Sequence, residues 1–242
     1  MIVEVWVAPL DVPPEVLAAL AASMAPSERA RAERSRDATT ARRFCTARGW
    51  LRHVLGAATA TAPADVRLVD GPGKPRLEGP AGLSFNLAHA GELALVAVAD
   101  REVGVDLEHV DSGPGGLEAV GLACSPAEAR ALAGLAPAAR PTAFLRLWTA
   151  KEAYLKGIGV GLAVAPATIG VGRADDAGFR PVRIEGGAGP EPWYVRELQP
   201  APRYVGAVAA EGRAWDVALR GAAAIGPTSS VDGGMDRRRG RT

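Results

Sequence analysis

Two acidic residues two positions apart, Asp106 and Glu108, are the first feature of the sequence that could do chemistry. In the segment 103–108 apolar residues alternate with them, as in a β-strand whose side chains point to opposite sides in turn. On such a strand the two carboxylates share one face and lie about 7 Å apart. A divalent cation with oxygen ligands would offset their repulsion and leave positions for phosphate oxygens and water. The alternative is an edge strand with a solvated acidic face.

A third acidic residue, Glu152, lies in the segment 141–156, which has the pattern of a helix. One face of this helix carries residues at spacings of three and four: Leu145, Trp148, Glu152 and Leu155. A carboxylate in that apolar, core-facing stripe costs several kcal/mol unless it is paired or bound to a metal. Lys156 lies four residues beyond Glu152, so an intrahelical Glu–Lys pair is the alternative.

Length and composition limit the class of protein that can hold these groups. A chain of 242 residues, 48% of them hydrophobic, can form one large domain or two small ones. The net charge of +1 argues against a general binder of nucleic acid or of a membrane surface. Cys45 and Cys124 form no CxxC pattern, so we expect free thiols in a reducing compartment. Neither a signal peptide nor a membrane span is recognisable, and we expect a cytoplasmic protein.

The elements that must position the acidic residues follow from patterning along the chain, which predicts an α+β fold. We expect strands at 2–8, 83–87, 93–99, 103–108, 168–171, 193–198, 204–209 and 215–219. We expect helices at 13–24, 42–56, 117–122, 125–134 and 141–156. The segment 28–43 is dense in arginine, and most of its arginines are expected on a solvated helix face. One or two of them could hold a phosphate.

Internal echoes indicate that the chain contains two similar parts. The echoing pairs are 46–52 with 149–156, and 93–99 with 203–209. We therefore expect two similar helix-plus-antiparallel-sheet halves related by pseudo-twofold symmetry, with the active site in the cleft between them. The predicted divisions are an N-terminal half at 1–102, a C-terminal half at 103–221 and a disordered tail at 222–242. Because such a fold supplies its own pseudo-dimer, we expect a monomer.

Four motifs, in this order and spacing, resemble those of one family. They are Gly73-Lys-Pro75, Phe85-Asn-Leu-Ala-His-Ala-Gly91, Gly104-Val-Asp-Leu-Glu108 and Trp148-Thr-Ala-Lys-Glu-Ala-Tyr-Leu-Lys156. The chain resembles the 4′-phosphopantetheinyl transferase family, of the long, two-halved, surfactin-type (Sfp-type) class, over most of 26–165. It departs from the family's pattern at Ala88, where a serine is usual, so one hydroxyl contact to phosphate is missing.

The resemblance implies a Mg²⁺-dependent transfer, with Mn²⁺ as the other candidate metal. The 4′-phosphopantetheine group of coenzyme A would move to a serine of an apo acyl or peptidyl carrier protein, releasing 3′,5′-ADP. The N-terminal half would hold the coenzyme A 3′-phosphate, and the loop 109–124 would grip the carrier protein. The resemblance does not choose between fatty-acid, polyketide and nonribosomal-peptide synthesis. One rival is a non-catalytic coenzyme A or nucleotide-binding module, which is disfavoured because all three carboxylates and Lys156 are present. The other is a docking scaffold, which would leave Glu152 in the apolar stripe unexplained.

The same resemblance suggests roles for the residues at the reaction centre. Asp106, Glu108 and Glu152 match the family's magnesium ligands, in agreement with the chemistry of three carboxylate oxygens. Glu152 is also the candidate general base for the incoming serine, directly or through a water. Lys156 and His89 match positions that contact the pyrophosphate, where positive charge would stabilise the leaving oxygens.

Further residues match the part of the family that holds the adenosine 3′-phosphate. Lys74 and Arg43, together with Arg31, are the candidates for this end of coenzyme A. Glu128 recurs in the family, but the capping box that begins at Ser125 already explains it.

Overall fold

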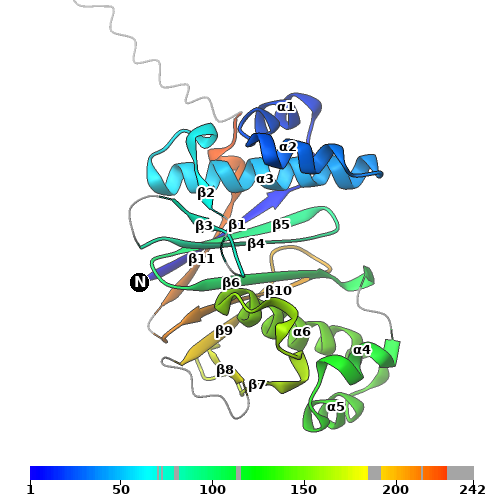
Figure 1. Ribbon diagram of the computed structural model, residues 1–242. Helices are drawn as coiled ribbons and strands as arrows, with labels where there is room; N and C mark the ends of the chain where they lie inside the picture. The colour runs from blue at the N-terminus through cyan, green and yellow to red at the C-terminus, as the bar shows by residue number, and fades with distance from the viewer. Residues whose placement is uncertain are drawn as a thin grey trace, which may run out of the picture.

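The structure is a computed structural model in which two β-sheets lie between two layers of helices (Figure 1). It describes residues 1–69, 71, 73–78, 82–112, 116–184, 192–213 and 215–227. The first sheet has the order β11-β1-β5-β4, with β1 (Ile2–Pro9), β4 (Ser84–Ala90), β5 (Leu93–Ala99) and β11 (Asp216–Gly221). The second has the order β6-β10-β9-β8-β7, with β6 (Val103–His109), β7 (Ile169–Val171), β8 (Arg180–Ile184), β9 (Trp193–Leu198) and β10 (Tyr204–Glu211). A small hairpin joins β2 (Leu68–Val69) and β3 (Arg76–Leu77).

Helices cover the outer face of each sheet (Figure 1). The helices are α1 (Pro14–Ala22), α2 (Pro26–Glu33), α3 (Ala38–Thr59), α4 (Gly116–Ala123), α5 (Pro126–Ala133) and α6 (Arg140–Ile158). The first three lie over the first sheet, and α6 lies against the second. Their ends follow local chemistry: the Asp37 side chain accepts a hydrogen bond from the Thr40 amide at the start of α3, and Ser125 caps α5.

The core between the sheets is built from the alternating apolar residues of their strands. Val3 and Val5 of β1 pack with Val103, Val105 and Leu107 of β6 in one buried cluster. The expected division of side chains along 103–108 is therefore confirmed, because this apolar face turns inward. The opposite face of β6, which carries Asp106, is turned toward α6.

The predicted α+β class is confirmed, and several predicted elements are corrected. The arginine-rich segment contains a separate helix, α2, and α3 begins at Ala38, earlier than predicted. β8 was not predicted, because its Pro181 is untypical of an interior strand. The chain enters the second sheet at β6 and returns to the first with β11, which pairs in parallel with β1. The two halves and their pseudo-twofold relation stay predictions.

The predicted disordered tail begins too early. Ala222–Ile225 forms a short 3₁₀ helix whose Ala222 is fully buried against Ala8 and Trp50. The rest of the predicted tail, 228–242, lies outside the described residues, as do 113–115 of the predicted carrier-protein loop.

Candidate active site

The site is assembled where strand β6 meets helix α6. A Cβ atom on Gly104 would lie 2.0 Å from the carbonyl oxygen of Ala153 and 2.3 Å from the amide nitrogen of Gly157. Only glycine permits this approach, because those atoms belong to the helix backbone. The close contact brings Asp106, two residues along β6, beside Glu152 and Lys156 of α6.

Asp106 is a buried carboxylate with one oxygen paired. Its side chain accepts a hydrogen bond from Nζ of Lys156, with 2.5 Å between Nζ and Oδ1. The other oxygen, Oδ2, is buried and has no hydrogen-bond partner among the described residues. Burial raises the pKa of Asp106, and the Lys156 charge opposes this. With 4% of the residue exposed, the alternative of a solvated acidic face is wrong for Asp106.

Glu108 and Glu152 complete a group of three carboxylates. Nε1 of Trp148 donates to Oε1 of Glu108 across 3.1 Å, which ties the strand to the helix a second time. Oε1 of Glu152 is buried and, within the described chain, has no hydrogen-bond partner. Burial raises the pKa of both glutamates, and the negative charge of Asp106 raises it further. The three carboxylates therefore act on one another through their charges.

The helical spacing predicted the stripe correctly, but it did not predict the partner of the lysine. Leu145 and Leu155 are buried, and Glu152 lies on their face of α6, half-buried. The ion pair of Lys156 is made with Asp106, not with Glu152 of its own helix. The alternative of an intrahelical Glu152–Lys156 pair is therefore wrong, because the carboxylate that pairs with Lys156 comes from β6.

The donor set fits a hard divalent cation. Within the described ranges no three His, Cys, Asp or Glu side chains are already arranged as a metal site. However, Asp106 and Glu152 each present a buried oxygen without a partner. Carboxylate oxygens are the ligands that Mg²⁺ and Mn²⁺ prefer, and a cation here would offset three mutually repelling charges. The residues therefore fit such an ion. In the structure the positive charge beside Asp106 is that of Lys156.

His89 lies near the end of β4 in the first sheet, close enough to this group for the charge of Lys156 to act on it. The residue is exposed overall, but partial loss of hydration of its imidazole lowers the pKa of His89. The positive charge of Lys156 lowers this pKa further. The imidazole is therefore neutral over most of the physiological range, and it can accept or donate a hydrogen bond.

Lys74 is held at the beginning of β6. Its Nζ atom lies 2.6 Å from Oε2 of Glu102, 2.9 Å from the Val103 carbonyl oxygen and 3.1 Å from Oγ of Ser84. Burial lowers the pKa of Lys74, and Glu102 opposes this. Three acceptors match the three N–H bonds of an ammonium group, so Lys74 joins the turn before β3 to the two sheets.

Arg43 and Arg31 lie on the first helical layer, each with a partner of its own. Nε and Nη2 of Arg43 donate to the two oxygens of Asp11, across 3.0 and 2.5 Å. The guanidinium carbon of Arg31 lies 5.2 Å from the centre of the Phe44 ring. Arg31 also lines a cavity of about 300 Å³ that reaches Pro75, the neighbour of Lys74.

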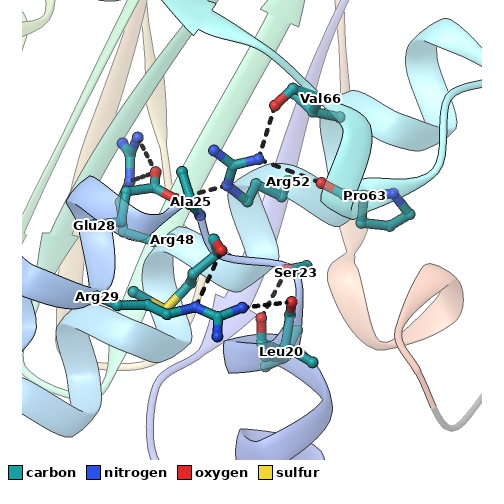
Figure 2. Close-up of polar contacts among 11 residues, drawn as sticks. Leu20, Ser23, Ala25, Glu28, Arg29, Arg48, Arg52, Pro63 and Val66 are labelled. Atoms are coloured by element: carbon teal, nitrogen blue, oxygen red, sulfur yellow. Dashed lines mark hydrogen bonds and ion pairs between the residues drawn. The ribbon is translucent and has the colours of Figure 1, made fainter.

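Sequence reasoning missed a buried charged cluster beneath this surface. Figure 2 shows Glu28 between the guanidinium groups of Arg48 and Arg52. Nη1 of Arg52 continues to the carbonyl oxygens of Val66, at 2.7 Å, and Pro63, at 3.4 Å. Glu28 also accepts from the Ala25 amide, and this N-terminal capping contact was the one local signal available.

Lys151 is a second buried cation, adjacent in sequence to Glu152 but paired with a different carboxylate. Its fully buried Nζ donates to Oε2 of Glu128, across 2.6 Å, and to the carbonyl oxygens of Ala123 and Pro166. The predicted capping box of Glu128 is confirmed, and the same carboxylate also neutralises Lys151.

None of the helices in the described ranges is both long and apolar enough to cross a membrane.

The family model of the 4′-phosphopantetheinyl transferase superfamily matches residues 102–209. The chain is 35% identical over 220 residues to the 4′-phosphopantetheinyl transferase HetI of Nostoc sp., covering 88% of this chain and 89% of that protein. It is 30% identical over 138 residues to a 4′-phosphopantetheinyl transferase of Bacillus subtilis, covering 57% and 59% of the two chains. It is 34% identical over 137 residues to a similarly named protein of Bacillus pumilus, covering 56% of this chain and 58% of that protein.

Proposed function

The chain belongs to the 4′-phosphopantetheinyl transferase superfamily, and from this premise we propose which residues carry its reaction. It is a transferase that moves the 4′-phosphopantetheine group of coenzyme A to a serine of an apo carrier protein. The serine oxygen forms a bond to the phosphorus that carries the pantetheine arm. The bond from that phosphorus to the bridging pyrophosphate oxygen breaks, and 3′,5′-ADP leaves.

Asp106, Glu108 and Glu152 would hold Mg²⁺, or Mn²⁺, on the face that β6 turns toward α6. Support comes from the two buried oxygens without partners and from the hard oxygen donor set. When bound, the ion would neutralise charge on the pyrophosphate oxygens. The carboxylates, two from strand β6 and one from helix α6, would hold the ion.

Glu152 would also accept the serine proton, since its side chain is half-buried at the same place. Lys156 and His89 would contact the pyrophosphate and stabilise the charge that develops on the leaving oxygens. Lys156 is suited to this because it already reaches across from α6 to β6.

Lys74, Arg43 and Arg31 would line the region that takes the adenosine 3′-phosphate end of coenzyme A. Arg43 and Arg31 lie on the helical layer of the first sheet, and Arg31 lines a cavity that reaches Pro75. Arg43 would have to exchange its bidentate contact with Asp11 for a contact with phosphate, which a guanidinium group can bind with the same geometry.

The carrier protein would be an acyl or peptidyl carrier protein domain, approaching beside the loop that includes α4. We also propose a monomer in the cytoplasm, with neither nucleic acid nor membrane as a partner. These statements rest on the family resemblance and on the chain's near-zero net charge.

The observation that carries the proposal is the group of Asp106, Glu152 and Lys156, in which each carboxylate has a buried oxygen without a partner among the described residues. It is tested by the intact mass of a purified apo carrier protein after incubation with the enzyme, coenzyme A and Mg²⁺. We expect a gain of one phosphopantetheine group, which is lost with EDTA or with Glu152→Gln. The matched control is Glu197→Gln, which changes a glutamate that pairs with Arg180 on the surface.

Transfer by Glu152→Gln at the wild-type rate would contradict the assigned site. Binding of coenzyme A without transfer to any of several carrier proteins would favour the non-catalytic binding module. A protein that binds no coenzyme A would contradict both functions.

A further inference from the structure

The two sheets meet at their edge strands, β4 and β6 (Figure 1). β6 makes its ladder with β10 on one side, where Val105 is opposite Val208. On the other side, Oδ1 of Asn86 in β4 accepts a hydrogen bond from the amide of Val105, across 3.0 Å. Both residues are buried, so this amide depends on a side chain from the other sheet.

A second side chain forms a hydrogen bond to the same edge of β6, at Val103, two residues before Val105. The Val103 carbonyl oxygen accepts from Nζ of Lys74. Two polar groups that a backbone ladder would have paired are thus taken by two side chains from the region of the first sheet. This pattern fixes β6 along its length relative to β4.

The position of β6 matters because both strands contribute to the candidate site. Val105 directly precedes Asp106, and Asn86 precedes His89 by three residues on β4. A small displacement of β6 would move Asp106 and Glu108 relative to His89, and misplacement of about 1 Å can cost 100-fold in rate.

We propose that Asn86 is a positioning residue, which sets the strand of Asp106 and Glu108 against the strand of His89. This inference rests on the proposed metal site and goes beyond it, because Asn86 itself would touch neither metal nor substrate. Its carboxamide acts through the Val105 backbone, as groups behind metal ligands commonly do.

The experiment compares Asn86→Leu with Asn86→Asp in the full-length protein. Leucine fills a similar volume but leaves the buried Val105 amide without an acceptor, whereas aspartate keeps an acceptor oxygen. Binding of Mn²⁺ to the protein alone is followed by the loss of its free-ion electron paramagnetic resonance signal. We expect Asn86→Leu to weaken Mn²⁺ binding on the order of tenfold. Asn86→Asp should bind Mn²⁺ with close to the wild-type affinity. We expect kcat to fall in Asn86→Leu and to stay near the wild-type value in Asn86→Asp, while KM for coenzyme A changes little in both.

A control variant separates positioning from general loss of stability. Val98, on β5 opposite Phe85, is buried in a cluster that faces the first helical layer. Val98→Ala should lower the melting temperature, as a core cavity does, without changing Mn²⁺ affinity.

Wild-type Mn²⁺ affinity in folded Asn86→Leu would overturn the inference. If the wild-type protein itself binds no Mn²⁺, the proposed metal site fails, and hydrogen exchange of the Val105 amide decides the positioning role. Protection that is lost in Asn86→Leu and kept in Asn86→Asp supports that role. Equal protection in all three proteins overturns it.

Discussion

Nζ of Lys156 lies 2.5 Å from Oδ1 of Asp106, and this ion pair joins helix α6 to strand β6 within the candidate site. The carboxylate is almost fully buried, whereas the lysine side chain is 32% exposed. The lysine thus offsets a buried negative charge, as a bound cation also could.

Replacing Lys156 with Gln is expected to lower the free energy of unfolding of the metal-free protein by about 1–3 kcal/mol, since a buried carboxylate loses its charged partner. Mg²⁺ should restore more stability to this variant than to the wild type, because the ion can take over the neutralising role. Urea unfolding with and without Mg²⁺ measures both effects. Arg146→Gln, an exposed change on the same helix, is the control, and an equal Mg²⁺ response in all three proteins contradicts the idea.

Replacing Asp11 with Asn should release Arg43 for the coenzyme A 3′-phosphate. We expect coenzyme A to bind up to about fivefold more tightly, because exposed ion pairs are worth up to ~1 kcal/mol. Dephospho-coenzyme A, which lacks that phosphate, should bind as before. Isothermal titration calorimetry with both ligands makes the comparison. Arg43→Gln is the variant that should no longer distinguish coenzyme A from dephospho-coenzyme A. An equal change for the two ligands would mean that Asp11 acts on the fold instead.

Local patterning predicted the parts of the site that depend on a single element. Alternation along β6 placed Asp106 and Glu108 on one face, and helical spacing placed Glu152 in the buried stripe of α6. The partner of Lys156 could not be predicted in this way, because Asp106 is 50 residues away and meets α6 through tertiary packing, which the close approach at Gly104 permits.

The same limit applies to the rest of the fold. The strand near residue 217 was expected from its composition, but its parallel pairing with β1 joins the two ends of the described chain. Arg52 pairs with Glu28 across 24 residues, and neither helix alone shows that these charges are buried together. Burial of polar groups is decided by packing between elements, and the pattern within one element does not report it.

Gly104→Ala should separate β6 from α6, since the added carbon would meet backbone atoms at 2.0–2.3 Å. We expect a loss of about 3 kcal/mol or more in the free energy of unfolding, together with loss of Mn²⁺ binding. Gly121→Ala in α4 is the matched control, because among the described residues no heavy atom beyond its own stretch of helix backbone lies within 4 Å of the added carbon. Alanine is favoured over glycine in a helix by roughly 0.5–1 kcal/mol, so this control should be neutral or stabilising. Thermal and urea unfolding test the pair, and similar stabilities would show that the close approach is not required.

Glu28→Gln should remove the charge that holds Arg48 and Arg52 in the first helical layer. Burial alone would raise the pKa of Glu28, but the Ala25 amide and the two guanidinium groups lower it below its ordinary value of 4.5. The stabilisation is therefore complete above that ordinary value and is lost as the pH falls through the lower, folded-state pKa. At neutral pH we expect a loss of about 3–5 kcal/mol, because buried Arg52 and partly buried Arg48 lose their partner. Urea unfolding from pH 3 to 7 should show the difference from wild type shrinking at acid pH, whereas Glu33→Gln, exposed on the same helix, should show little difference at any pH. A difference that stays constant down to pH 3 would mean that the charge of Glu28 is not what stabilises this layer.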